Sequence, residues 1–446
     1  MIRAAAIAAA AALACGGDRP ARITRSDRDA ATVAVVDRPR AGGGGPATPE
    51  REPNDAPDPA AAVAAPTNTG VLDGAGDVDL YPVAVDRPAV LTVGLSAMAG
   101  IDGALELRGA DGAKVVAVDS AGAGGAEALP NWPVAPGRYY VAVREIARKA
   151  KPKRGVDAGA GRLGASPPYT LTVGLADGPA PDAEREPNDD RGAATALDLA
   201  TTATGWLGWA GDVDVWKLDV LALGPGDGLD VAVTAVPKVA LTVELTDAGG
   251  RSLVRQVGAA GAAVAIKNLA PQVAPGEPAA HYVVIGGKPA SGVAYQLTVT
   301  SRVLDAGAEA EPNDRADRAN PLGTVDDDTG TMRGELGPGQ RDHFVLAPRA
   351  AAAVLDLAVD GPPGLAVALT VTGGAIGTGT RSGDRVAATG LAVAPGQPVV
   401  IALSAPKGAT PAGPYRLRWS LSPPAVDEPT APDEPDPGDD PMPPEL

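Results

Sequence analysis

The sequence predicts an all-β chain of three tandem β-sandwich domains, and three observations carry that prediction. A six-residue acidic motif occurs three times, the same landmarks follow each copy in the same order, and the segments between the landmarks alternate apolar with polar residues. Such alternation is typical of strands that bury one face. We therefore expect a repeated unit of two packed sheets.

The acidic motif opens each predicted unit. It reads Glu-Arg-Glu-Pro-Asn-Asp at 50–55 and 184–189, and Glu-Ala-Glu-Pro-Asn-Asp at 309–314. A Val-Ala-Pro-Gly turn follows each copy, and then a closing strand begins at a tyrosine, which is Tyr169, Tyr295 or Tyr415. These landmarks predict unit 1 at 50–178, unit 2 at 179–303 and unit 3 at 304–422.

The predicted strands are clearest in unit 2. Apolar residues occupy every second position in the runs 229–233, 241–245 and 295–299, so one face of each run must be buried. Turn residues such as Asp111-Gly112 separate similar runs in unit 1. No segment after the N-terminal one has the periodicity of a helix. The chain has only one Phe, seven Tyr and five Trp, so the cores must consist mainly of Val, Leu and Ala.

The segments outside the units have distinct compositions. Residues 1–15 resemble a lipoprotein-type signal peptide, because Arg3 precedes eleven apolar residues and Ala12-Leu13-Ala14-Cys15-Gly16 resembles a lipobox whose leucine lies one place late. Eleven apolar residues are too few to span a bilayer. We expect lipidation at Cys15, the only cysteine, and the alternative is an incidental cysteine in an ordinary signal peptide. A flexible linker at 16–49 and a disordered, acidic, proline-rich tail at 423–446 complete the predicted organisation.

The signal peptide predicts that the protein is exported. The lipobox predicts a lipoprotein of the outer membrane or cell surface, held in the membrane through its lipid anchor only. The alternative is a freely secreted protein. The formal charge of −17 argues against nucleic acid as a partner, because phosphate binding needs clustered Lys and Arg.

The motif also predicts a cation site. Glu50, Glu52 and Asn54 alternate in a segment that Pro53 keeps extended, so their side chains should point to one side. Asp77 and Asp79 form a second alternating pair before a predicted strand. If the fold joins the two segments, the carboxylates repel one another unless a cation lies between them. Oxygen ligands without His or Cys favour Ca²⁺.

The candidate calcium ligands follow the repeats. In unit 1 they are Glu50, Glu52, Asn54, Asp55, Asp77 and Asp79; in unit 2 they are Glu184, Glu186, Asn188, Asp189, Asp212 and Asp214. Unit 3 offers Glu309, Glu311, Asn313, Asp314 and Asp342. We expect its site to be weakened or empty, because Gln340 replaces the first aspartate and Arg341 adds a cation. The alternative is that the acids only cap turns and keep the chain soluble.

The Glu-Pro-Asn-Asp motif followed by Gly-Asp-x-Asp and an aromatic residue resembles the bacterial pre-peptidase C-terminal (PPC) domain. The second part of the pattern lies at 76–81 and 211–216, and the resemblance covers nearly all of 50–421. It implies a jelly-roll-like β-sandwich related to the collagen-binding domains of clostridial collagenases. In those relatives acidic residues at these positions ligate calcium, which implies the same for the residues named above.

Three other features leave alternatives open. The only histidines, His281 and His343, lack a nucleophile or a metalloprotease motif beside them, so we expect core-edge or surface residues and no enzyme. Trp206 and Trp209 could form a ligand platform, or pack in the core or between units. An insertion in unit 1 is a solvated loop or a docking site for an acidic partner, and its basic residues are Arg148, Lys149, Lys151, Lys153 and Arg154.

Together these features predict a non-catalytic surface lipoprotein whose calcium-stabilised array binds an extracellular or envelope protein or a polysaccharide. The alternatives are a structural spacer or assembly component of the cell envelope and, third, an accessory subunit of a secreted protease.

Overall fold

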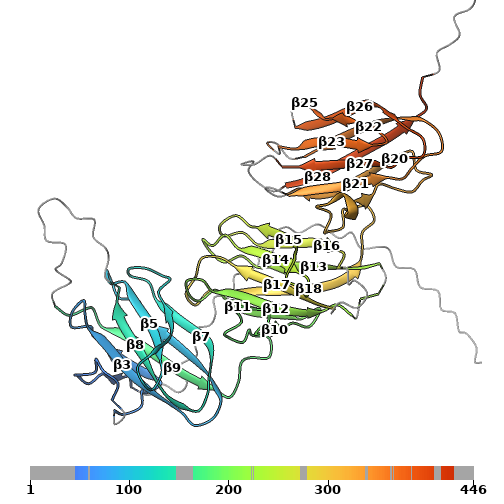
Figure 1. Ribbon diagram of the computed structural model, residues 1–446. Coiled ribbons are helices and arrows are strands. Elements are labelled where there is room, and N and C mark those ends of the chain that lie inside the picture. Colours follow the sequence, from blue (N-terminus) through green and yellow to red (C-terminus); the bar gives the residue numbers. More distant parts are fainter. Residues whose placement is uncertain are drawn as a thin grey trace, which may run out of the picture.

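The computed structural model confirms an all-β chain of tandem sandwiches (Figure 1). Strands account for all of its regular structure except one short 3₁₀ helix, η1 (Ala316–Arg318), within the residues that the structure describes. Those residues are 46–58, 61–146, 164–221, 223–224, 226–271, 279–336, 340–361, 364, 366–382, 384–405 and 413–425.

Unit 1 consists of two facing sheets. One has the order β1-β2-β9-β4-β7 and the other the order β3-β8-β5-β6. This interleaving of early and late strands is that of a jelly roll, in which the chain crosses between the sheets repeatedly. The strands are β1 (Thr48–Pro49), β2 (Thr67–Gly70), β3 (Val78–Val85), β4 (Ala89–Leu95), β5 (Gly103–Arg108), β6 (Lys114–Val118), β7 (Glu127–Val134), β8 (Gly137–Glu145) and β9 (Tyr169–Ala176).

Unit 2 repeats the same order, except that its short edge strand belongs to the other sheet. Its sheets run β11-β18-β13-β16 and β10-β12-β17-β14-β15, where the short edge strand β10 pairs in parallel with β12. The strands are β10 (Thr195–Ala196), β11 (Thr202–Trp206), β12 (Val213–Asp219), β13 (Asp227–Val233), β14 (Thr242–Thr246), β15 (Ser252–Val257), β16 (Val264–Leu269), β17 (Ala280–Gly286) and β18 (Ala294–Val303).

Unit 3 again has this arrangement, with the sheets β20-β28-β22-β26-β25 and β19-β21-β27-β23-β24. The strands are β19 (Asn320–Pro321), β20 (Thr329–Leu336), β21 (Arg341–Leu346), β22 (Ala353–Asp360), β23 (Ala368–Gly373), β24 (Gly377–Thr378), β25 (Thr380–Ser382), β26 (Arg385–Val393), β27 (Val399–Ser404) and β28 (Gly413–Ser422).

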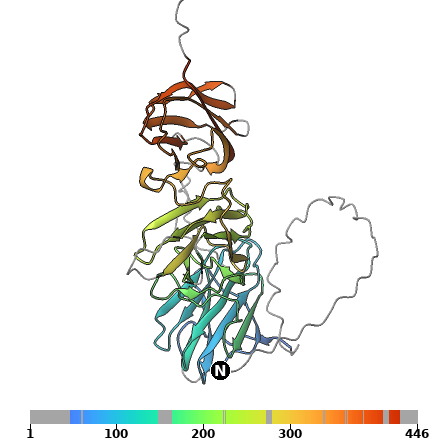
Figure 2. The same ribbon diagram turned by 90° about the vertical axis from the view of Figure 1, so that its right-hand side faces the viewer.

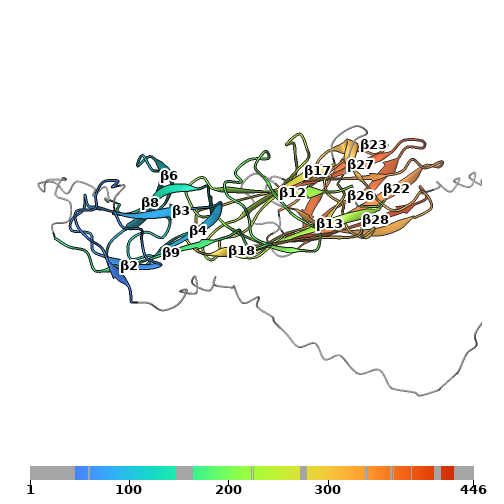
Figure 3. The ribbon, with the colours of Figure 1, turned by 90° about the horizontal axis from the view of Figure 1, so that it is seen from below.

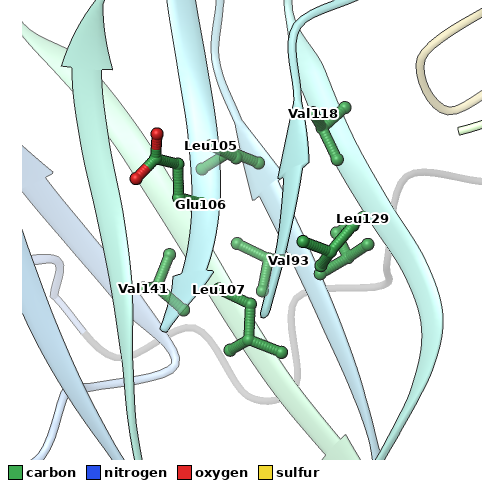
Figure 4. Close-up of a pocket in the computed structure, with 8 residues that line it drawn as sticks. Val93, Leu105, Glu106, Leu107, Val118, Leu129 and Val141 are labelled. Carbon is green, nitrogen blue, oxygen red and sulfur yellow. The ribbon is translucent and has the colours of Figure 1, made fainter. Parts of the chain in front are cut away.

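Each unit has its own hydrophobic core between its sheets. Figure 4 shows part of the core of unit 1, where Val93, Leu105 and Leu129 meet from both sheets. Glu106 follows Leu105 and points to the other face of its sheet, where it pairs with Arg108 and Arg144 at 2.6 and 2.7 Å. The alternation expected from the sequence therefore sends successive side chains to opposite faces of the sheet, and Glu106 is buried on its own face with these arginines.

The three sandwiches lie one after another along the chain, as Figures 1, 2 and 3 show from three directions. Among the residues described, none belongs to a helix long and apolar enough to cross a membrane. The predicted signal peptide with Cys15, most of the linker and tail, and the basic residues 148–154 lie outside the described residues.

Candidate calcium sites

The acidic motif of unit 2 alternates as the sequence predicts. Glu184, Glu186 and Asn188 are buried, whereas the residues between and after them, Arg185, Pro187 and Asp189, are exposed. The Glu-Pro peptide bond is cis in all three copies of the motif. Three oxygen-bearing side chains thus enter the protein from one side of a single segment.

Oε1 of the first glutamate of each motif accepts a hydrogen bond from the backbone. In unit 2, Glu184 Oε1 accepts a hydrogen bond from the backbone N–H of Trp206 at 2.9 Å. The same bond joins Glu50 to Val71 and Glu309 to Glu335, both at 2.6 Å. The carboxylate is therefore fixed in orientation. Its second oxygen has no hydrogen-bond partner among the described residues in unit 2, whereas it accepts a hydrogen bond from Tyr169 in unit 1 and from Tyr415 in unit 3.

The second glutamate is held in a similar way. Its Oε2 accepts a hydrogen bond from the N–H of the asparagine two residues later, at 3.0, 3.1 and 3.0 Å in units 1, 2 and 3. The carbonyl of this asparagine in turn accepts a bond from the strand that carries the second acidic segment, from Leu80, Val215 or His343. These bonds fasten the motif beside β3, β12 and β21.

The aspartates reach the same place from that strand. Asp214 of β12 is fully buried, and its Oδ2 accepts a hydrogen bond from the Tyr295 hydroxyl at 2.6 Å. Asp212, just before the strand, accepts a bond from the N–H of Gly208. One oxygen each of Glu184, Glu186 and Asp214 lie within 4.8 Å of one another. The two segments that the sequence singled out therefore converge.

Five oxygens at this point in unit 2 are buried and accept no hydrogen bond from any described residue. They are Glu184 Oε2, Glu186 Oε1, Asn188 Oδ1, Asp212 Oδ1 and Asp214 Oδ1. A buried carboxylate oxygen without a partner is costly, and the four carboxylate oxygens of this set, together with the amide oxygen of Asn188, require a counter-charge. Since all five are hard oxygen donors from different side chains, the set fits Ca²⁺.

Electrostatics leads to the same conclusion. Burial, reinforced by the charge of Asp212, raises the pKa of Glu186 to about 8, and burial raises the pKa of Asp212 to about 7. Burial also raises the pKa of Glu184 and of Asp214 well above the usual range. The next cause is the charge of Asp214 for Glu184 and the charge of Asp212 for Asp214. At neutral pH this cluster must retain protons or bind a cation.

Unit 1 has the same geometry in a more open setting. One oxygen each of Glu50, Glu52 and Asp79 lie within 4.8 Å of one another, and burial raises the pKa of Asp79 to about 8. One end of the Asn54 amide lies 3.3 Å from Glu52 Oε1 and 3.2 Å from Asp79 Oδ1. With nitrogen at this end the amide donates to both carboxylates, and with oxygen there all three could face one cation. Glu52 itself is exposed.

Unit 3 has a smaller set of buried acidic side chains. Glu309, Glu311, Asn313 and Asp342 are buried together, and burial raises the pKa of Glu311 to about 8. Gln340 takes the place of Asp212, so the buried set has three carboxylates where unit 2 has four. No group of three acidic oxygens as close as those of units 1 and 2 occurs in the described part of this unit.

The last aspartate of the motif lies at the rim. Asp55, Asp189 and Asp314 are exposed, and the first two accept bonds from the N–H of Val78 at 3.4 Å and of Val213 at 3.2 Å. Asp55 and Asp189 are thus not members of the three-carboxylate clusters of units 1 and 2, and Asp77 is partly buried.

Two residues of each site were not recognised from the sequence. The tyrosine that opens the closing strand donates to the cluster: Tyr169 to Asp79, Tyr295 to Asp214, and Tyr415 to Glu309 at 2.6 Å. A glycine on the adjacent strand, Gly70, Gly205 or Gly334, lets this hydroxyl and the first glutamate approach, because a Cβ there would collide with both. Both residues carry a sequence signal. The tyrosine is a repeated landmark of the three units, and the glycine repeats in the pattern Thr-x-Thr-Gly in units 1 and 2.

The tryptophan and histidine side chains are not members of the carboxylate clusters. Trp206 is buried and Trp209 packs edge-on against Trp132 of unit 1, with ring centroids 5.4 Å apart, which confirms packing in the core and between units. His281 is buried at the start of β17, as expected of a core-edge residue, and its Nδ1 lies 3.3 Å from the Ala279 carbonyl. His343 Nδ1 lies 3.1 Å from the carbonyl of Asn313.

Comparison with known proteins finds likenesses among solved structures. No family model and no curated protein matches the chain. A crystal structure of the pre-peptidase C-terminal domain of a collagenase from Bacillus anthracis is similar at 21% identity, over 24% of this chain and 87% of that one, with a TM-score of 0.18. A crystal structure described as that of a putative secreted protein from Eubacterium rectale shares 8% identity over 52% of this chain and 80% of its own, also with a TM-score of 0.18. These scores are too low to carry an argument, so the fold rests on the strand pairing.

Proposed function

We propose that the chain is an exported, non-catalytic array of β-sandwiches whose units bind structural Ca²⁺, and that it serves as a spacer or assembly component at the cell surface. The five unpartnered oxygens of unit 2 are the observation that carries the proposal. Calcium supplies the positive charge that balances these carboxylates, and extracellular fluid supplies the calcium. The resemblance to PPC domains supports the same ligand set.

A spacer role is favoured over a carbohydrate platform because the tryptophans that could stack on a sugar are used inside the molecule. Trp206 is buried, and Trp209 contacts Trp132. The two histidines support a non-catalytic role, since each is buried with Nδ1 beside a backbone carbonyl. Recognition of an extracellular protein or polysaccharide stays a prediction, and calcium-dependent pull-down from envelope material would test it.

Calcium binding can be tested on the full chain after calcium is removed with a chelating resin. Binding to the folded state alone adds RT ln(1 + [Ca]/Kd), about 2.7 kcal/mol at a hundredfold excess over Kd. We expect calcium to raise the melting temperature, and Glu186→Gln to reduce this rise. Glu244→Gln is the matched control, because Glu244 lies on β14 outside the site. Equal melting of the wild-type chain with and without calcium would overturn the proposal.

A further inference from the structure

One strand of each unit contains a bulge at the same place. Strands β7, β16 and β26 pair with β4, β13 and β22, and the register shifts at Leu91/Val93, Leu229/Val231 and Leu355/Leu357. In each bulge one residue has a left-handed backbone. It is Asn131 at φ 56°, Asn268 at φ 56° and Gly390 at φ 69°. Glycine adopts this conformation without strain, so asparagine in units 1 and 2 calls for a reason.

The reason is a contact with the next unit. Asn131 Nδ2 donates to the backbone carbonyl of Glu184, and Asn268 Nδ2 donates to the backbone carbonyl of Glu309 at 2.6 Å. Asn268 Oδ1 also accepts a bond from the N–H of Asp305 at 2.8 Å. Both asparagines are buried. Each one therefore binds the first glutamate of the calcium site that follows it in the chain.

Neighbouring contacts fix the same two surfaces. Trp132, next to Asn131, packs on Trp209, and Trp209 belongs to the loop in which Gly208 binds Asp212. At the second joint, the N–H of Glu311 donates to the Asn268 carbonyl at 3.1 Å, and the N–H of Ala270 donates to the Glu311 carbonyl at 2.6 Å. Unit 2 thus touches both motif glutamates of unit 3. Unit 1 touches the first motif glutamate of unit 2 and the loop that binds Asp212.

The sites are more buried in the units that follow another unit. Glu186 is 3% exposed and Glu311 is 6% exposed, and each of their units has a unit docked before it. Glu52 is exposed, and in the part of the chain that the structure describes no unit lies before unit 1. A docked unit therefore accompanies a dehydrated site. Electrostatic attraction between carboxylates and a cation is stronger in such a setting than in water.

We propose that the face around Asn131 and Asn268 is the docking surface for the next unit of the same chain, and that docking and cation binding at that next site are coupled. The coupling rests on the proposed calcium function, whereas the docking surface does not. Gly390 occupies the same position in unit 3, against which no further unit packs among the residues described.

The docking surface can be tested with glycine variants, because glycine keeps the left-handed backbone and removes only the side-chain contact. Spin labels at the exposed positions Val115, Val257 and Ile376 report distances between units in a Cys15→Ser chain. Asn131→Gly should broaden the 115–257 distance distribution and leave 257–376 unchanged. Asn268→Gly should do the reverse, and Gly390→Asn, the control, should change neither. Unchanged distributions in both asparagine variants would overturn the docking proposal.

The coupling is tested by calorimetric calcium titration of a chain that retains only the second site, through Glu52→Gln and Glu311→Gln. Loss of a buried hydrogen bond there predicts that Asn131→Gly weakens calcium binding about threefold to tenfold. Asn268→Gly, which lies at the other joint, should leave it unchanged. Equal affinity with and without Asn131→Gly would overturn the coupling. If the wild-type chain binds no calcium, the proposed function fails, and the label distances still decide the docking surface.

Discussion

The calcium-free protein should become less stable as the pH rises from 5 to 7.5. Burial raises the pKa of Glu186 to about 8 from a usual value of 4.5. Over this range the carboxyl of the unfolded chain is mostly ionised, whereas that of the folded chain mostly retains its proton. Because the folded state then binds more protons than the unfolded state, the free energy of unfolding falls with pH. The free energy of unfolding keeps falling until the pH passes about 8, where the folded carboxyl also loses its proton.

The magnitude for Glu186 alone is on the order of 3 kcal/mol, since each pH unit contributes about 1.4 kcal/mol per group. For a domain of this size that corresponds to a fall of roughly 10–20 °C in melting temperature. Calcium should reverse the trend, because protons and calcium compete for the same oxygens and calcium binding strengthens as the protons leave.

Differential scanning calorimetry of the full chain at pH 5 and 7.5, after calcium removal by a resin, measures the effect. Glu186→Gln removes one titrating group and should flatten the pH dependence, whereas the control Glu244→Gln should not. A melting temperature that rises with pH in the calcium-free protein would refute the reasoning, as would equal pH dependence in both variants.

Three further perturbations have defined outcomes. Tyr295→Phe removes the hydrogen bond to Asp214 and should lower the free energy of unfolding by about 1–3 kcal/mol in calcium, measured by denaturant titration; no change would mean that the hydroxyl is dispensable. Gly205→Ala should destabilise unit 2 because its Cβ would collide with Tyr295 and Glu184, and Gly178→Ala, with open space around it, should melt as the wild type. Cys15→Ser should release the protein from membranes in cell fractionation; equal membrane association of the variant and the wild type would contradict lipidation at Cys15.

The fold could be predicted from the sequence because its signals are local and occur three times. Alternation in β13 and β18 places Val231 and Val299 in the core of unit 2, as expected. The bulges could not be predicted, because a left-handed residue such as Asn268 interrupts the period of two and leaves no local signal. Asparagine occupies this position because its side chain contacts the following unit.

The site could be predicted only in its acidic half. Glu184, Glu186, Asn188, Asp212 and Asp214 alternate within two short segments, so their spacing reveals a shared direction. Tyr295 and Gly205 come from strands that pair with each other across the fold, and nothing local to either residue indicates the carboxylate between them. The difference in burial between Glu52 and Glu186 depends on a neighbouring unit, which no single repeat encodes.

Anomalous X-ray diffraction from crystals grown in calcium tests the central claim most directly. The account predicts an anomalous peak in unit 2 with oxygens at about 2.3–2.6 Å. Those oxygens should be the five that lack hydrogen bonds, from Glu184, Glu186, Asn188, Asp212 and Asp214. Crystals grown in calcium that show no peak there, with the carboxylates paired through shared protons, would contradict it.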